Sequence, residues 1–123
     1  MKRLVLLVLL STTACAPSTE VDPNAAPVVL VVESHRSLLG EACGFDFSYR
    51  AVNRSYSGFK HPLDGSRQVI PLNLERGEAF VLSAQGNCES GGGLEAWAYA
   101  DGQLVDNAVA NQPYGVVQVS GVY

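Results

Sequence analysis

Hydrophobic and polar residues alternate along much of the chain, with the period of two that is typical of half-buried β-strands. The alternation is clearest over residues 42–52, where one face carries Cys43, Phe45, Phe47, Tyr49 and Ala51. Residues 79–85 repeat it. Shorter runs rich in valine and other strand formers predict further strands at 27–33, 69–74 and 114–122. Pro71 predicts that its strand lies at a sheet edge or bulge, because proline cannot donate a ladder hydrogen bond.

Asp101-Gly102 lies between two alternating runs and predicts a β-hairpin with a type I′ turn. An unbroken ladder from this turn sets the pairing of the two strands. It predicts the inner pairs Ala100–Gln103, Ala98–Val105, Ala96–Asn107 and Leu94–Val109, and the outer pairs Tyr99–Leu104 and Trp97–Asp106.

These patterns predict seven or eight short strands separated by turn residues, with no sustained helical period. The fold class they favour is all-β, a single immunoglobulin-like antiparallel β-sandwich over residues 28–123. A small closed β-barrel is the alternative. Residues 53–67 show no clear alternation and are expected to form a long irregular loop.

The N-terminus predicts export. Met1-Lys2-Arg3 is basic, and the apolar run Leu4–Leu10 is far shorter than the roughly 20 residues that cross a bilayer, so residues 1–14 are typical of a signal peptide. The small residues leading into Ala14-Cys15 resemble the lipobox of bacterial lipoproteins, although Thr12 stands where an aliphatic residue is usual.

The lipobox resemblance implies cleavage before Cys15, a lipid on that cysteine and anchoring in the membrane of the cell envelope. Ala16 favours the outer membrane or cell surface over the inner membrane. An ordinary signal peptide followed by an incidental cysteine is the alternative. Residues 15–27, rich in Pro, Ser, Thr and Ala, are expected to form a flexible tether.

The remaining cysteines, Cys43 and Cys88, are expected to form a disulfide, since exported proteins fold in oxidising compartments. The loop they close, about 46 residues, corresponds to a stabilisation of ~4 kcal/mol on the chain-entropy account. Cys43 lies on the apolar face of its strand, so the bridge is expected to point inward. The positions of both cysteines at or near predicted strands favour a bridge between two sheets.

The charge balance argues against nucleic acid as a partner. The sequence has 8 basic and 12 acidic residues, and loss of Lys2 and Arg3 with the signal peptide makes the chain more acidic still. An acidic domain repels phosphate backbones.

The C-terminal part resembles the periplasmic module of the MmpS-type accessory proteins of mycobacterial lipid exporters. The residues that carry this resemblance are Leu82–Gln85, Asp101-Gly102, Leu104-Val105 and Tyr114–Val116, within a stretch of about 40 residues. The resemblance implies a β-sandwich and a transport-accessory role, and it transfers no catalytic residue. Those relatives carry a transmembrane helix where this chain has a lipobox.

No catalytic motif, metal-ligand spacing or cofactor-binding motif is present in the sequence, and His35 and His61 stand alone in polar segments. Two surfaces are candidates for binding. Trp97, Tyr99 and Leu104 form one aromatic face of the hairpin, unless that face is the core or is covered by a loop. Arg54, Lys60 and Arg67 form a basic group on an acidic protein, which suits anionic headgroups or an acidic partner; a solvated loop is the alternative.

The expected function is that of a non-enzymatic, membrane-anchored envelope lipoprotein that binds an envelope protein partner as an interaction or transport-accessory module. The alternative is a small lipoprotein that inhibits a hydrolase by inserting the loop at residues 53–67.

Overall fold

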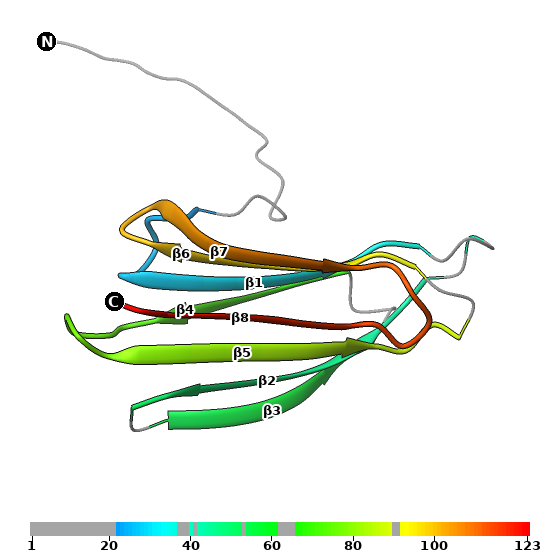
Figure 1. Ribbon diagram of the computed structural model, residues 1–123, viewed down its shortest axis with the longest axis horizontal. Coiled ribbons are helices and arrows are strands. Elements are labelled where there is room, and N and C mark those ends of the chain that lie inside the picture. The colour runs from blue at the N-terminus through cyan, green and yellow to red at the C-terminus, as the bar shows by residue number, and fades with distance from the viewer. Residues whose placement is uncertain (1–21, 37–39, 41, 53, 62–65, 90–91) are drawn as a thin grey trace, which may run out of the picture.

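The computed structural model describes residues 22–36, 40, 42–52, 54–61, 66–89 and 92–123. The strands of this part of the chain are β1 Val28–Ser34, β2 Phe45–Ala51, β3 Arg54–Lys60, β4 Arg67–Leu72, β5 Ala79–Gly86, β6 Leu94–Ala100, β7 Gln103–Ala110 and β8 Val116–Val122. They form two antiparallel sheets, sheet A in the order β4-β1-β6-β7 and sheet B in the order β3-β2-β5-β8. The strands run along the long axis of the molecule and the connections gather at its two ends (Figure 1).

The predicted β-sandwich is confirmed, and the barrel alternative is wrong because the two sheets do not close on each other. The pairing of β1 with β4, and the order β3-β2-β5-β8, reproduce the B–E and C′–C–F–G pairings of immunoglobulin-like sandwiches. The hairpin of β6 and β7 is inserted between β5 and β8, and it extends sheet A on the free side of β1. β4, which carries Pro71, is an edge strand as expected.

The core lies between the two sheets and is formed by every second side chain of their strands, the ones that point inward. Sheet A contributes small side chains from β6, with Ala96 and Ala98 fully buried, and sheet B contributes large ones from β2, with Phe45 and Phe47 buried. Small residues on one layer thus leave room for aromatic rings of the other, which is how a sandwich core reaches close packing. The remaining core residues are mainly valines and leucines of β1, β4, β5 and β8.

The type I′ turn of the hairpin is confirmed, since φ is +50° at Asp101 and +80° at Gly102. The predicted register is correct for the first two pairs and wrong beyond them. A β-bulge makes Val105 an extra residue, so that Ala98 pairs with Asp106 and Ala96 with Ala108. The bulge turns Ala108 and Ala110 toward the core, where an unbroken ladder would have placed Asn107 and Val109.

The bulge also joins the edges of the two sheets. The side chain of Asp106 reaches β8, where its Oδ2 accepts a hydrogen bond of 2.9 Å from the backbone N–H of Ser120. Both β7 and β8 are edge strands, so this carboxylate satisfies a backbone donor that would otherwise face outward from sheet B.

The expected loop at residues 53–67 is wrong over Arg54–Lys60, which form β3. This strand pairs along its whole length with β2, from Phe45–Lys60 to Ala51–Arg54. Its sequence lacks an apolar alternation because most of β3 is exposed at the edge of sheet B. Residues 53 and 62–65 lie outside the described residues.

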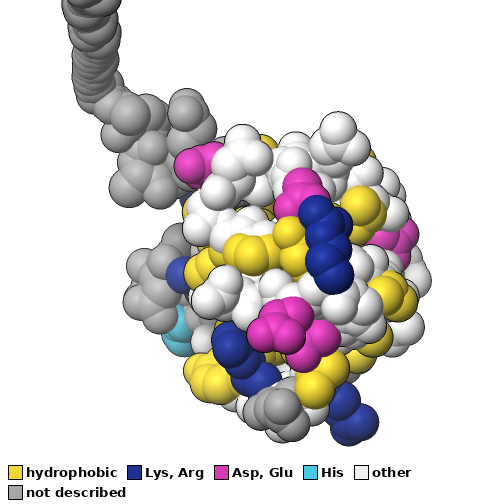
Figure 2. All heavy atoms as spheres, turned by 90° about the vertical axis from the view of Figure 1, so that its left-hand side faces the viewer, with side chains coloured by type: hydrophobic (Ala, Val, Ile, Leu, Met, Phe, Trp, Pro, Cys, Tyr) yellow, Lys and Arg dark blue, Asp and Glu magenta, His cyan; other side chains and the backbone are white. Residues whose placement is uncertain are grey.

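One end of the sandwich collects the start of β1, the β6–β7 turn, the β4–β5 connection and Tyr123 (Figure 1). Figure 2 shows this end with basic, acidic and hydrophobic side chains intermixed. Residues 22–27, the last part of the expected tether, lead into β1 here, and the carbonyl of Pro27 accepts a hydrogen bond from the N–H of Asp101. Residues 1–21, with the expected signal peptide and Cys15, lie outside the described residues.

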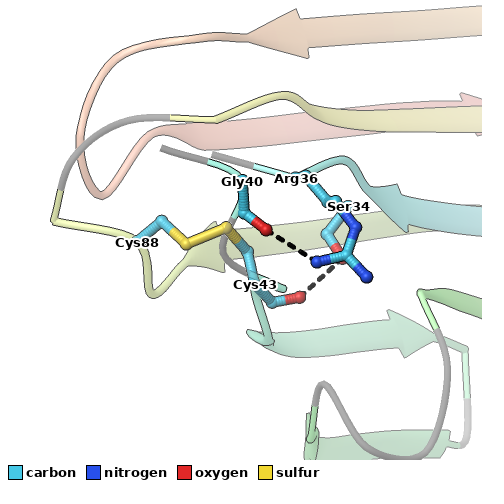
Figure 3. The surroundings of a disulfide bond; sticks show 5 residues. All are labelled: Ser34, Arg36, Gly40, Cys43 and Cys88. Carbon is cyan, nitrogen blue, oxygen red and sulfur yellow. Dashed lines mark hydrogen bonds between the residues drawn. A yellow bond between two sulfur atoms is a disulfide. The ribbon is translucent and has the colours of Figure 1, made fainter. Parts of the chain in front are cut away.

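The disulfide between Cys43 and Cys88 is confirmed, at a Cα–Cα distance of 5.5 Å. The expected bridge between sheets is wrong. Cys43 precedes β2 and Cys88 follows β5, two neighbours in sheet B, and the hydrogen bond from the N–H of Asn87 to the carbonyl of Gly44 continues their ladder toward the bridge. Cys43 is buried as expected, and its carbonyl accepts a 2.7 Å hydrogen bond from the Ser34 hydroxyl of sheet A (Figure 3).

Removing the bridge by the double substitution Cys43→Ser and Cys88→Ser is expected to lower the free energy of unfolding by about 4 kcal/mol, because the unfolded chain regains the entropy of an open loop. Urea unfolding of the variant and of the parent protein measures the difference. The reduced parent protein is the control and should match the variant. Equal stability of the oxidised protein and the variant would contradict the prediction.

Candidate functional site

The outward side of sheet A is an apolar surface built from all four strands. In the register of the sheet, one row across it is Pro71–Val29–Tyr99–Leu104, and the next begins Val69–Val31–Trp97. We call this surface, together with Val109, the apolar face. It follows from the unbroken valine run of β1, which places hydrophobic residues on both sides of the strand.

The apolar face is largely open to solvent at its margins. Val29 and Val31 in its centre are buried, Trp97 and Tyr99 beside them are half-buried, and Val69, Leu104 and Val109 are exposed, the last two by 54% and 57%. The alternative in which the aromatic residues form the core is wrong, because the alanines on the opposite side of β6 do so. Large aromatic side chains that expose part of their surface on a rigid sheet are suited to serve as binding anchors.

Polar side chains border the apolar face at the disulfide end of the sheet. Arg67 donates from Nη2 to Glu33 Oε1 at 2.9 Å, and Asn107 donates from Nδ2 to Glu95 Oε2 at 3.0 Å. Arg67, Glu33 and Glu95 lie in the row next to that of Trp97, and Asn107 is the neighbour of Trp97 in its own row. An apolar centre with a polar margin is the usual composition of a protein–protein interface.

The structure separates the predicted basic residues from one another. Arg67 belongs to the margin of the apolar face, whereas Arg54 and Lys60 are at opposite ends of β3 in the other sheet. The predicted basic group therefore does not form one surface. Arg54–Lys60 of the loop in the hydrolase-inhibitor alternative are paired in a sheet.

A charged cluster fastens the hairpin turn to both sheets. Asp101 accepts a hydrogen bond of 2.5 Å from the Tyr123 hydroxyl through Oδ1, and one of 2.7 Å from Arg76 Nη2 through Oδ2. The Arg76 guanidinium lies over the Tyr123 ring, 4.3 Å from its centroid. Arg76 belongs to the β4–β5 connection and Tyr123 follows β8, so three separate segments meet at one carboxylate.

This cluster shifts the pKa values of two of its members. The hydrogen bond from Tyr123, followed by that from Arg76, lowers the pKa of the Asp101 carboxyl below its ordinary 3.8. The same hydrogen bond to Asp101 raises the pKa of the Tyr123 hydroxyl above its ordinary 10.0. Both shifts reflect a hydrogen bond that is made between an ionised carboxylate and a protonated phenol.

Among the described residues, no group of three or more His, Cys, Asp or Glu side chains is placed to hold a metal ion. His35 donates its backbone N–H to the carbonyl of Gly93, and the His61 ring meets the Phe59 ring edge to face. The described part of the chain also contains no helix with the length and apolar character needed to cross a bilayer.

Sequence reasoning found Trp97, Tyr99 and Leu104 but missed the other residues of the apolar face. Val69 and Pro71 join it from β4, and Val109 joins it only because of the bulge. The sequence of β1 already indicated that its neighbour β4 could carry hydrophobic residues on the outward side. A strand that is hydrophobic at every position has an apolar outward side, and its neighbours on that side need not be polar.

Comparison with protein-family models, with curated proteins and with solved structures finds no match for this chain.

Asp101→Asn is expected to change how stability depends on pH. A lowered folded-state pKa stabilises the protein fully above the unfolded value of 3.8, and this contribution disappears as pH falls through the folded value. The parent protein should therefore be more stable than the variant at neutral pH and lose that advantage in acid. Asn tolerates the positive φ of this turn position, so the turn itself is retained.

Unfolding of both proteins across a pH series reaching well below 3.8 tests this expectation. Tyr123→Phe, which removes the largest cause of the shift, should move the acid loss to higher pH. A stability difference between parent and Asp101→Asn that stays constant across the series would contradict the role given to the carboxylate.

Proposed function

We propose that this protein is a non-enzymatic envelope lipoprotein whose β-sandwich binds a protein partner through the apolar face of sheet A. The observation that carries the proposal is the group of Trp97, Tyr99, Leu104 and Val109 on one outward side of a rigid sheet. Exposing hydrophobic side chains together on one face is unfavourable unless a second surface covers them.

The partner is a protein of the same compartment with an apolar contact surface. Export and lipidation at Cys15 remain inferences from the N-terminal sequence, and they define that compartment as the cell envelope. The tether that follows Cys15 is short and enters the domain at the start of β1, so a lipid on Cys15 would keep the domain near the membrane surface. The resemblance to transport-accessory modules makes a membrane transporter the first partner to examine.

Polar substitution on the apolar face is expected to weaken partner binding. Burying one large aliphatic side chain is worth about 1.5–3 kcal/mol, so Leu104→Ser with Val109→Ser should weaken binding by about 100-fold or more. Cross-linking in intact envelopes identifies the partner, and titration with the purified partner measures the affinity of each variant.

The matched control is Val52→Ser with Val122→Ser, because these valines are exposed by 56% and 68% and lie away from the apolar face. Equal binding by the two double variants would refute the face as the interface. A concentration-dependent dimer that the first variant abolishes would instead identify a second copy of this chain as the partner.

Lipidation at Cys15 has a direct test. Mass spectrometry of the mature protein from its native envelope should find residues 1–14 removed and Cys15 carrying acyl groups. Cys15→Ser should release the protein from the membrane fraction while the unfolding curve of the β-sandwich stays the same. Recovery of an unmodified Cys15 thiol on membrane-bound protein would contradict the anchor.

A further inference from the structure

The outward side of sheet B differs from that of sheet A, because it is polar and built around small hydroxyl side chains. Its register gives three rows across the four strands. The central row is Ser57–Ser48–Ser83–Gln118, and the rows on either side are Phe59–Asp46–Gln85–Val116 and Ser55–Arg50–Val81–Ser120. We call this surface the serine face.

Two hollows lie on the serine face. One, of about 350 Å³, extends from the central row toward Asp46, Gln85 and Val116, and the other, of about 410 Å³, extends toward Arg50, Ser55 and Gln118. Ser48, Ser57 and Ser83 line both. Larger residues on the flanking rows rise above these serines, so the hollows follow from the alternation of small and large side chains along the strands.

Strand formation does not account for the serines. Exposed strand positions favour β-branched and aromatic residues, and serine is not among the residues enriched there. Three serines nevertheless occupy one row on three adjacent strands, about 4.8 Å from one strand to the next. The Ser83 hydroxyl donates to Gln118 Oε1 at 3.0 Å, while the side chains of Ser48 and Ser57 make no hydrogen bond to another described residue.

The chemistry of this surface suits a neutral ligand rich in hydroxyl groups. A serine hydroxyl can donate and accept, and a glutamine amide offers both functions, so each can pair with a sugar hydroxyl in either sense. Asp46 and Arg50 have opposite charges and flank Ser48 on the same strand, so the face has no charge preference. Phosphorylated or polyanionic ligands therefore gain little here.

Apolar side chains at the ends of one row complete the surface. Phe59 and Val116, exposed by 51% and 59%, lie at the two ends of the row that contains Asp46. The His61 ring meets the Phe59 ring nearly perpendicularly, at 81° and a centroid distance of 6.1 Å, which restrains the orientation of the phenyl group. Such a surface can pack against the C–H side of a sugar ring while hydroxyls bond to the serines.

From this arrangement we infer that the serine face binds a neutral oligosaccharide, lying across the strands along the row of Ser57, Ser48 and Ser83. This site is separate from the apolar face, since the two belong to the outward sides of different sheets. The two proposals therefore stand or fall independently.

Titration of the isotopically labelled full chain with maltoheptaose and with tetra-N-acetylchitotetraose tests the inference by NMR, in a zwitterionic detergent that carries no sugar headgroup. We expect saturable shifts of the backbone signals of β2, β3 and β5 with at least one of these neutral sugars. Ser48→Val and Ser83→Val should each weaken binding by about tenfold, since each removes one hydrogen-bonding hydroxyl.

Val122→Ser is the control, because Val122 is exposed on β8 of the same sheet, belongs to none of the three rows and lines neither hollow. It should leave the affinity unchanged, as should Leu104→Ser on the apolar face. Absence of saturable shifts with both sugars, affinity unchanged by the Ser48 and Ser83 substitutions, or binding confined to the polyanion oligogalacturonate would each overturn the inference. Far-UV circular dichroism and thermal unfolding establish that every variant is folded.

Discussion

The side of sheet A that each residue of β7 faces determines which of its side chains enter the core and which lie on the outward surface. Because side chains alternate along a strand, a single inserted residue reverses which side every later side chain takes. Val105 is that residue, and beyond it Ala108 and Ala110 enter the core while Val109 joins Trp97 on the outward side. The same reversal directs Asp106 toward β8, where it bonds to Ser120 and links the edges of the two sheets. The packing of β7 in the core, the edge contact and the place of Val109 on the apolar face therefore share one local cause.

Local signals in the sequence were sufficient for most of the fold. The alternation at β2 and β5, the Asp101-Gly102 turn and the edge position of Pro71 each depend on neighbouring residues, and each is confirmed. The bulge, the strand β3 and the path of the disulfide depend on contacts between distant segments. β3 has no apolar alternation because it lies at an edge, and whether two cysteines join neighbouring strands or opposite sheets depends on the strand order, which spacing does not encode. The apolar face was found only in part, since Val69 and Pro71 join it through the pairing of β4 with β1 and Val109 joins it through the bulge.

The outward sides of the two sheets have opposite chemistry. Sheet A presents valine, leucine and aromatic side chains, whereas sheet B presents serine and glutamine around a few charged and apolar residues. The division follows from the strands themselves: β1 is hydrophobic at nearly every position, while β2 alternates strictly. A sandwich with two unlike outward surfaces can contact two different molecules at once, and its disulfide and charged cluster lie at the two ends, clear of the centres of both surfaces.

The position of β1 has a mechanical consequence. The chain before Val28 leads directly into a strand that is hydrogen-bonded to β4 on one side and to β6 on the other, and the bond between Asp101 and Pro27 extends the second ladder to the point of entry. A force applied through the preceding segment cannot peel this strand from an edge. It must break the ladders to β4 and to β6 together, so both neighbours of β1 resist tension applied from the N-terminal side of the domain.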